Sequence, residues 1–349
     1  MVVGGMKRIL DICLFIAVFV SSSCSHKELC YHHPHVASVQ INADWTGFEK
    51  DRPSGMTVMV YSRSGDKVIE KQTNNTSFAI VDLLVGYYNS VVYNQSPEEY
   101  GTVEFRGMDK YPTAQVCASP IDSRWYKTRG EKEVLAVSPE WIGTDRVEDI
   151  EITQRMVDIT GENKLANMNT RDIASDFIVA RHHPENIIYT IGIKVHLKNV
   201  YNLKSARASL DGMAEGFMFS TGMTTESEVT HLLENWRLVV DKNDPTMGYI
   251  EASITSFGLP CNHKGLPGEN KFNLSVLLVD NKTIIDFPFE VGDKFVFKKD
   301  EAGKLILECD IELWAKDPLP DVKPEGTGND GFDAWVEDWG EEENFDLEI

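Results

Sequence analysis

Short stretches in which apolar and polar residues alternate recur along most of this chain. Val39–Trp45 alternates with period two, and so does Leu305–Leu313, in which one face is apolar and the other mostly acidic. Met56–Ser62 and Tyr87–Tyr93 are rich in β-branched and aromatic residues. Because a strand points alternate side chains to opposite faces, this pattern predicts half-buried strands. Turn-forming residues separate the stretches, which favours antiparallel β-sandwiches.

Helical patterns are few. Asn163–Ala180 and Glu226–Glu234 are the best candidates for helices. The chain has 349 residues, of which 42% are hydrophobic and 26% charged, as is ordinary for a folded protein. This length exceeds what one hydrophobic core usually supports, so the sequence predicts two domains of a mostly β fold class.

The charge balance excludes some classes of function. Asp and Glu number 55 against 34 Lys and Arg, which gives a net charge of -21. Phosphate binding needs clustered basic residues, so nucleic acid is not expected as a partner. No apolar run of 18 residues follows residue 24. We therefore expect no membrane-spanning helix in the remaining chain.

The first 23 residues have the pattern of an export signal. Lys7 and Arg8 precede the mostly apolar stretch Ile9–Val20, and Ser21–Cys24 closes it. Twelve apolar residues are too few to span a bilayer as a helix. A cysteine at this place resembles the lipobox of bacterial lipoproteins, although Ser21 stands where Leu is usual. We therefore predict lipidation of Cys24 and attachment to the outer membrane, the alternative being ordinary signal cleavage beside an incidental cysteine.

We predict five regions along the chain. A boundary near residues 160–185 is suggested by His182-His183-Pro184, which precedes a strand pattern as His32-His33-Pro34 does earlier. The predicted regions are a signal peptide at 1–23, a lipidated linker at 24–36, β-sandwich domains at 37–180 and 181–318, and an acidic tail at 319–349. From Pro318 onward the chain has 11 acidic residues and one lysine, a net charge of -10. The apolar residues of this tail favour an ordered final strand over a disordered one.

Four segments resemble fimbrillin-like lipoproteins of Bacteroides-type bacteria. They are Cys24–Cys30 leading to Asp44-Trp45, Asp82–Asn94 (DLLVGYYNSVVYN), Ala206–Gly216 (ARASLDGMAEG) and Val336–Trp339 (VEDW). In the second, Gly86 can turn the chain with positive φ before a core strand. In the third, Asp211 stands where Ser is commoner. The segments are spread over both predicted domains, although each alone is weakly specific.

This resemblance implies a fold and a role. It implies two tandem antiparallel β-sandwich domains with transthyretin-like topology, and a structural, anchor or accessory subunit of a surface fimbrium. Other fimbrillin-like subunits would be its partners, joined by β-strand addition. In major fimbrial subunits an Arg-directed protease removes an amino-terminal strand, whereas anchor-type relatives keep their lipid and are not cut. Arg52, Arg63 and Arg106 are candidates for such a cut by position alone, and none is assigned. The expected strand-exchange segment comprises Val336, Trp339, Phe345, Leu347 and Ile349.

Glycan binding on the cell surface is the alternative function. Trp125 and Trp141 lie among polar or turn residues, so they are the candidate sugar-stacking platform. Trp45 and Trp314 stand at strand ends, and we expect both in the core. A glycan binder needs coplanar exposed aromatic side chains, whereas a fimbrial subunit needs an open sheet edge or an exchangeable strand.

Catalytic and metal chemistry find little support. The sequence contains no G-x-S-x-G, H-E-x-x-H or P-loop pattern. His32-His33-Pro34-His35 and His182/His183/Glu185 are weak metal candidates. We therefore expect neither an enzyme, nor a metal, nor a cofactor. In an exported chain Cys30, Cys117, Cys261 and Cys309 could form disulfides, but free buried thiols are at least as consistent with their spacing.

Overall fold

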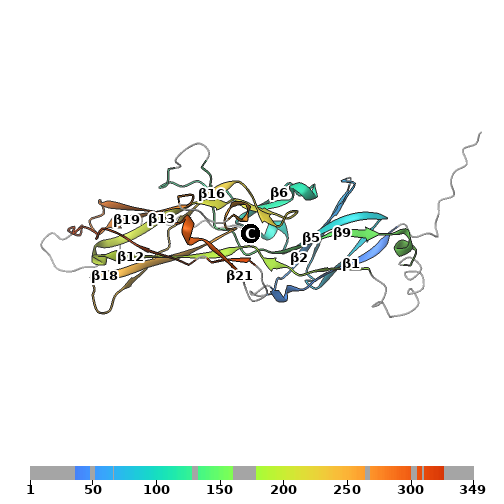
Figure 1. Ribbon diagram of the computed structural model, residues 1–349, viewed down its shortest axis with the longest axis horizontal. Helices are drawn as coiled ribbons and strands as arrows, with labels where there is room; N and C mark the ends of the chain where they lie inside the picture. Colours follow the sequence, from blue (N-terminus) through green and yellow to red (C-terminus); the bar gives the residue numbers. More distant parts are fainter. Residues whose placement is uncertain are drawn as a thin grey trace, which may run out of the picture.

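The computed structural model describes residues 36–47, 52–65, 67–127, 133–159, 178–263, 268–299, 305–308 and 310–325. Figure 1 shows an elongated molecule with one β-sandwich at each end of its long axis. The mostly antiparallel β architecture predicted from the sequence is confirmed. Helical structure among the described residues is limited to a short helix at 154–159 and to single 3-10 turns. These turns are η1 (Trp45–Gly47), η2 (Pro97–Glu99), η3 (Tyr111–Thr113), η4 (Val200–Asn202), η5 (Pro260–Asn262) and η6 (Gly292–Lys294).

The amino-terminal sandwich consists of two sheets. The first has the order β10-β1-β4, with β10 (Ile178–His182), β1 (Ala37–Ala43) and β4 (Phe78–Leu83). The second has the order β11-β9-β5-β2-β3, with β11 (Glu185–Asn186), β9 (Gly143–Ile152), β5 (Gly86–Asn94), β2 (Met56–Ser62) and β3 (Val68–Thr73). Val39, Val58 and Val92 belong to one buried cluster between the two sheets. Gly86 begins β5 with a φ of 156°, which agrees with the positive φ expected there.

The carboxy-terminal sandwich also has two main sheets. One has the order β17-β18-β12-β23, with β17 (Arg237–Val240), β18 (Met247–Ser256), β12 (Tyr189–Lys198) and β23 (Asp310–Trp314). The other has the order β20-β19-β13-β16-β8, with β20 (Ile284–Glu290), β19 (Lys271–Leu278), β13 (Leu203–Ala214), β16 (Glu228–Leu233) and β8 (Leu135–Ala136). Strict alternation in β12 and β19 buries one face of each strand against the other sheet.

Strands from the two halves of the chain meet in the middle of the molecule. A four-stranded sheet has the order β15-β14-β7-β6, with β15 (Met223–Thr224), β14 (Gly216–Met218), β7 (Gln115–Ala118) and β6 (Val103–Arg106). There β7 pairs with β14, while β8 pairs with β16 and β9 with β11. Strand pairing therefore crosses the boundary predicted at residue 180. The division of the chain into two domains at that residue stays a prediction. The hairpin of β21 (Val296–Lys299) and β22 (Leu305–Glu308) completes the strands.

One hydrophobic core extends through this middle region. Tyr93 of β5, Phe105 of β6 and Phe219 after β14 stack, with ring centroids 4.8 Å apart for Tyr93–Phe105 and 5.8 Å for Tyr93–Phe219. Each such aromatic pair adds about 0.5–1.5 kcal/mol beyond the burial of its area. The same cluster continues into Leu210 and Phe272 of the carboxy-terminal sandwich. The two halves are thus joined by packing as well as by the chain.

Two predictions about secondary structure are wrong. Residues 228–233, expected in a helix, form β16, because β13 and β8 flank this segment and supply backbone partners on both sides. The stretch Leu305–Leu313, expected as one strand, belongs to two sheets, because β22 pairs with β21 and β23 with β12. The other predicted helix ends within β10, and its residues 163–177 lie outside the described part of the chain.

Candidate functional site

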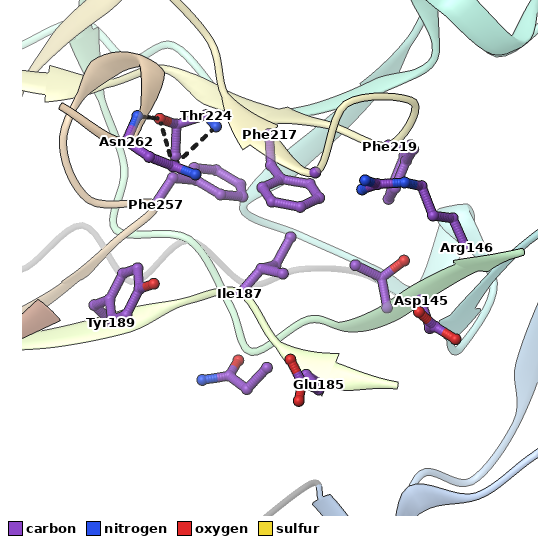
Figure 2. A pocket seen from close by; sticks show the side chains of 13 residues that line it. Asp145, Arg146, Glu185, Ile187, Tyr189, Phe217, Phe219, Thr224, Phe257 and Asn262 are labelled. Carbon is purple, nitrogen blue, oxygen red and sulfur yellow. Dashed lines mark hydrogen bonds between the residues drawn. The ribbon is translucent and has the colours of Figure 1, made fainter. Parts of the chain in front are cut away.

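A cavity of about 420 Å³ lies where the two halves meet. Strands from both halves line it, and Figure 2 shows aromatic side chains on one side and acidic side chains on the other. The main lining residues are Asp145, Arg146, Glu185, Ile187, Tyr189, Phe217, Phe219, Thr224, Phe257 and Asn262. Glu185 of β11 pairs with Thr144 of β9, so these two strands lie side by side. Asp145 and Glu185 therefore line the same wall of the cavity.

Arg146 crosses this cavity toward Gly222. A Cβ at position 222 would overlap the Arg146 guanidinium, and Gly222 has a φ of 70°, so glycine is favoured there on both counts. On the opposite wall, the Thr224 hydroxyl donates to the Leu259 carbonyl at 2.6 Å and accepts from the Asn262 backbone N–H at 2.9 Å. These bonds hold β15 against η5.

Beside the cavity, three residues have the connectivity of a nucleophilic triad. The Ser90 hydroxyl lies 2.8 Å from Nε2 of His182, and Nδ1 of His182 lies 3.4 Å from Asp145 Oδ2. Ser90 is fully buried and His182 is only 1% exposed, so a substrate carbonyl has no access to the hydroxyl. Burial would raise the pKa of Asp145, but the nearby His182 imidazole and the hydrogen bond from the His183 backbone N–H outweigh it and lower this pKa. The array fastens β5, β9 and β10 together.

Nor do the hydroxyls that line the cavity favour covalent chemistry. Thr144 and Thr224 both donate to backbone carbonyls, so neither hydroxyl is directed at a basic side chain. Within the described residues, no group of three His, Cys, Asp or Glu is placed to hold a metal ion. His32, His33 and His35 lie outside the described residues. The expectation of no metal and no catalysis therefore stays a prediction.

The structure places the two candidate platform tryptophans on different elements. Trp125 is half-buried, its indole N–H donates to the Glu234 carboxylate, and the Arg207 guanidinium lies over its ring at 5.3 Å. Trp141 is also half-buried and precedes β9, where its carbonyl accepts from Asn94. One face of Trp125 is thus occupied by Arg207. A sugar platform made of this pair stays a prediction.

Of the two tryptophans expected in the core, one is buried and one is not. Trp45 is 8% exposed and its indole N–H donates to the Thr76 carbonyl at 2.7 Å. Trp314 is 61% exposed, so its assignment to the core is wrong. The alternation of β23 buries Ile311 and Leu313, and Trp314 follows the acidic face instead. The period-two pattern of the sequence already contained this signal.

Several predicted site residues lie outside the described part of the chain. These are Cys24, Cys30 and Cys309, together with the strand-exchange residues Val336, Trp339, Phe345, Leu347 and Ile349. Of the remaining cysteines, Cys117 and Cys261 are free thiols. Burial raises the pKa of the Cys117 thiol to about 11. Across the described residues, no helix has the length and apolar character needed to cross a bilayer.

The first described strand occupies the middle of its sheet. β1 pairs with β4 on one side and with β10 on the other, in antiparallel and parallel register respectively. Ala37, Val39 and Ile41 are fully buried, and the Ser38 hydroxyl donates to Asp82 at 2.5 Å. The amino-terminal sandwich is therefore closed by a strand that directly follows the predicted linker.

Comparison with known proteins gives relatives along the whole chain. A protein of Bacteroides ovatus described as "Putative fimbrium anchoring subunit Fim4B" is 21% identical over 343 residues, which cover 96% of this chain and 97% of the relative. A solved structure described as a "putative adhesin" from Bacteroides ovatus has 16% identity and a TM-score of 0.54, covering 86% of this chain and 99% of that one. The fimbrial anchor protein Mfa2 from Porphyromonas gingivalis has 13% identity and a TM-score of 0.39, covering 73% and 82%.

A family model matches residues 23–234, which is more than half of the chain and includes the amino-terminal sandwich, β7, β8 and most of the cavity wall. The relation to fimbrillin-like proteins expected from the sequence motifs agrees with this match and with the relative of Bacteroides ovatus. The chain belongs to the family described as a domain of unknown function, DUF5119.

Proposed function

We propose that this protein is a lipid-anchored surface subunit of a fimbrium, with a structural, anchor or accessory role. The observation that carries the proposal is the match to a described fimbrium anchoring subunit, which covers 96% of this chain and 97% of that relative. A match of this extent includes both sandwiches and their junction. The proposed role needs no catalytic residue, which accords with a triad-like array whose serine is fully buried.

The membrane attachment in this proposal depends on Cys24. Ala37, the first residue of β1, lies thirteen residue steps after Cys24 (37 − 24 = 13), and a fully extended chain of that many steps reaches about 45 Å. Acylation at two or more positions would hold such a protein stably, whereas one chain gives marginal affinity. The protein would then stand on the outer membrane, on its surface, with the amino-terminal sandwich nearest the lipid.

Assembly in this proposal uses β-strand addition. Main-chain hydrogen bonds would supply affinity, and side chains at alternate positions would supply specificity. Because β1 already fills the middle of its sheet, this sandwich does not need a strand from a neighbour to close it. That arrangement favours a terminal position in a fimbrium. The tail residues Val336, Trp339, Phe345, Leu347 and Ile349 would provide the strand offered to the next subunit.

Isolation of the native protein from mildly solubilised outer membranes tests this proposal. We expect a second fimbrillin-like subunit to co-purify in a complex that resists SDS unboiled and dissociates on heating. A matched variant truncated after residue 325 should lose the complex, while the described fold, which ends there, remains intact. Recovery of the full-length chain only as a monomer from cells that bear fimbriae would contradict the assembly proposal.

A further inference from the structure

A row of aromatic side chains crosses the outer face of the sheet β17-β18-β12-β23. Strand register places Trp314 of β23 beside His196 of β12, and His196 beside Tyr249 of β18. The rings of Trp314 and His196 stack with centroids 5.0 Å apart and an angle of 5° between their planes. Tyr249 lies 5.6 Å from His196, with its ring tilted by 53°. All three side chains project from the face opposite to the buried core.

The indole of Trp314 is held in a fixed orientation and is still accessible. His196 Nε2 lies 2.7 Å from a carboxylate oxygen of Glu312, so the imidazole that supports the indole is itself fixed. Trp314 is 61% exposed. Among the described strands β23 pairs only with β12, so the indole face turned away from His196 meets no neighbouring strand.

A polar cavity of about 680 Å³ adjoins the row on the same face. Gly192 forms part of its floor, because a Cβ there would approach Asp310 Oδ1 to 2.7 Å. Its polar walls are Lys194, Asn235, Arg237, Glu251, Ser253, Asp310 and Glu312. From Gly192 in the cavity floor to His196 in the aromatic row, four residue steps along β12 span about 13 Å. A ligand that contacts both would be an extended chain rather than a single small ring.

The charges around this cavity are mixed. Arg237 pairs with Glu251, and the Lys194 ammonium lies 4.8 Å from the centre of the Tyr249 ring. Two basic and three acidic residues among the lining give a local net charge of -1. The whole chain carries -21, so an anionic ligand would be repelled over a longer range as well. An uncharged ligand rich in hydroxyl groups is the best match for these donors and acceptors.

We propose that this face binds a neutral oligosaccharide. The C–H face of a pyranose would pack on the free face of the Trp314 indole, where the negative ring face attracts polarised C–H groups. The next sugar units would lie along β12, and their hydroxyl groups would bond to the carboxylates and amines around Gly192. A protein partner fits less well, because the aromatic row is one residue deep and flanked by charged side chains rather than by a wide apolar patch. The inference does not rest on the fimbrial role.

Isothermal titration calorimetry of the purified full chain with neutral hexasaccharides tests the site. The probes are linear hexamers of glucose, mannose, xylose and N-acetyllactosamine type, with a sialylated oligosaccharide as the anionic comparison. We expect at least one neutral probe to bind with Kd below about 1 mM, and Trp314→Ala to weaken it by about tenfold or more. Tyr87→Ala is the matched control, because it removes an exposed aromatic side chain from β5 of the other sandwich, and it should leave this binding unchanged.

A second variant separates binding from folding. Gly192→Ser would narrow the cavity without touching Trp314, and it should weaken binding of the same probe. The thermal unfolding temperature of Trp314→Ala should equal that of wild type, which shows that its loss of binding is not a loss of folding. Absence of binding by every neutral probe at about 5 mM, equal binding by wild-type and Trp314→Ala, or stronger binding of the sialylated probe would each overturn the proposal. If the wild-type chain binds no glycan and Trp314→Ala loses a protein subunit that co-purifies with wild type, the face docks a protein and the oligosaccharide proposal is overturned.

Discussion

His231 is a buried side chain at the place where the two halves of the chain meet. It is fully buried, and its Nδ1 lies 3.1 Å from the Ala136 carbonyl, which can only accept a hydrogen bond. Nδ1 therefore carries the proton in the neutral ring, and Nε2 has no hydrogen-bond partner among the described residues. Burial lowers the pKa of His231 from 6.5 to about 4, because the surrounding core disfavours the charged form.

This lowered pKa predicts an acid-dependent loss of stability. Between pH 6.5 and about pH 4 the unfolded chain protonates His231 while the folded chain does not, so the free energy of unfolding falls as the pH falls. Above pH 6.5 the neutral His231 contributes about 3 kcal/mol to the free energy of unfolding, on the order of 1.4 kcal/mol for each pH unit between the two pKa values. Urea unfolding as a function of pH should show a shallower slope in His231→Gln than in wild type. An unchanged slope in His231→Gln would contradict the assignment.

At the scale of elements, the pairing of β7 with β14 joins the two halves. Cys117 stands opposite Gly216 in this pair, and the Ala118 backbone N–H donates to the Glu215 carbonyl at 2.8 Å. A Cβ at position 216 would overlap the Val116 carbonyl oxygen and approach the Cys117 sulfur to 2.8 Å. Gly216 is therefore needed because another backbone passes within contact distance.

Gly216→Ala is predicted to force β14 away from β7. Overpacking of this kind costs roughly 1–3 kcal/mol of unfolding free energy. The midpoint of urea unfolding measures this loss. Gly47→Ala is a suitable control, because among the described residues a Cβ there would meet only the Pro184 carbonyl oxygen, at 3.8 Å. Equal midpoints for Gly216→Ala and wild type would show that the close approach is not required.

The sequence predicted elements better than their partners. The predicted strand Met56–Ser62 begins and ends at the same residues as β2, because β-branched residues and flanking turns mark a strand locally. Glu228–Leu233 is a strand only because β13 and β8 lie beside it, and no local signal specifies those neighbours. The cavity at the junction and the row of Trp314, His196 and Tyr249 likewise depend on register between distant segments. Alternation assigns a residue to a face, but it does not say which strand lies next to it.

At the scale of the whole molecule, a continuous core makes the two sandwiches one mechanical body. Tyr61 and Val91 of the amino-terminal half share a buried cluster with Leu197 and Phe295 of the carboxy-terminal half. Calorimetry should therefore show one cooperative unfolding transition rather than two. Two transitions separated by several degrees would mean that the halves unfold independently.

We propose that Cys24 anchors a fimbrium to the outer membrane, and cells that carry Cys24→Ala test this anchoring. We expect the variant chain to leave the outer-membrane fraction and intact fimbriae to accumulate in the culture medium, because two or more acyl chains would be lost together. Cells with Cys261→Ala, which removes a half-buried free thiol, should keep both on the cell. Wild-type numbers of attached fimbriae on Cys24→Ala cells, with the chain still in the outer membrane, would contradict the account.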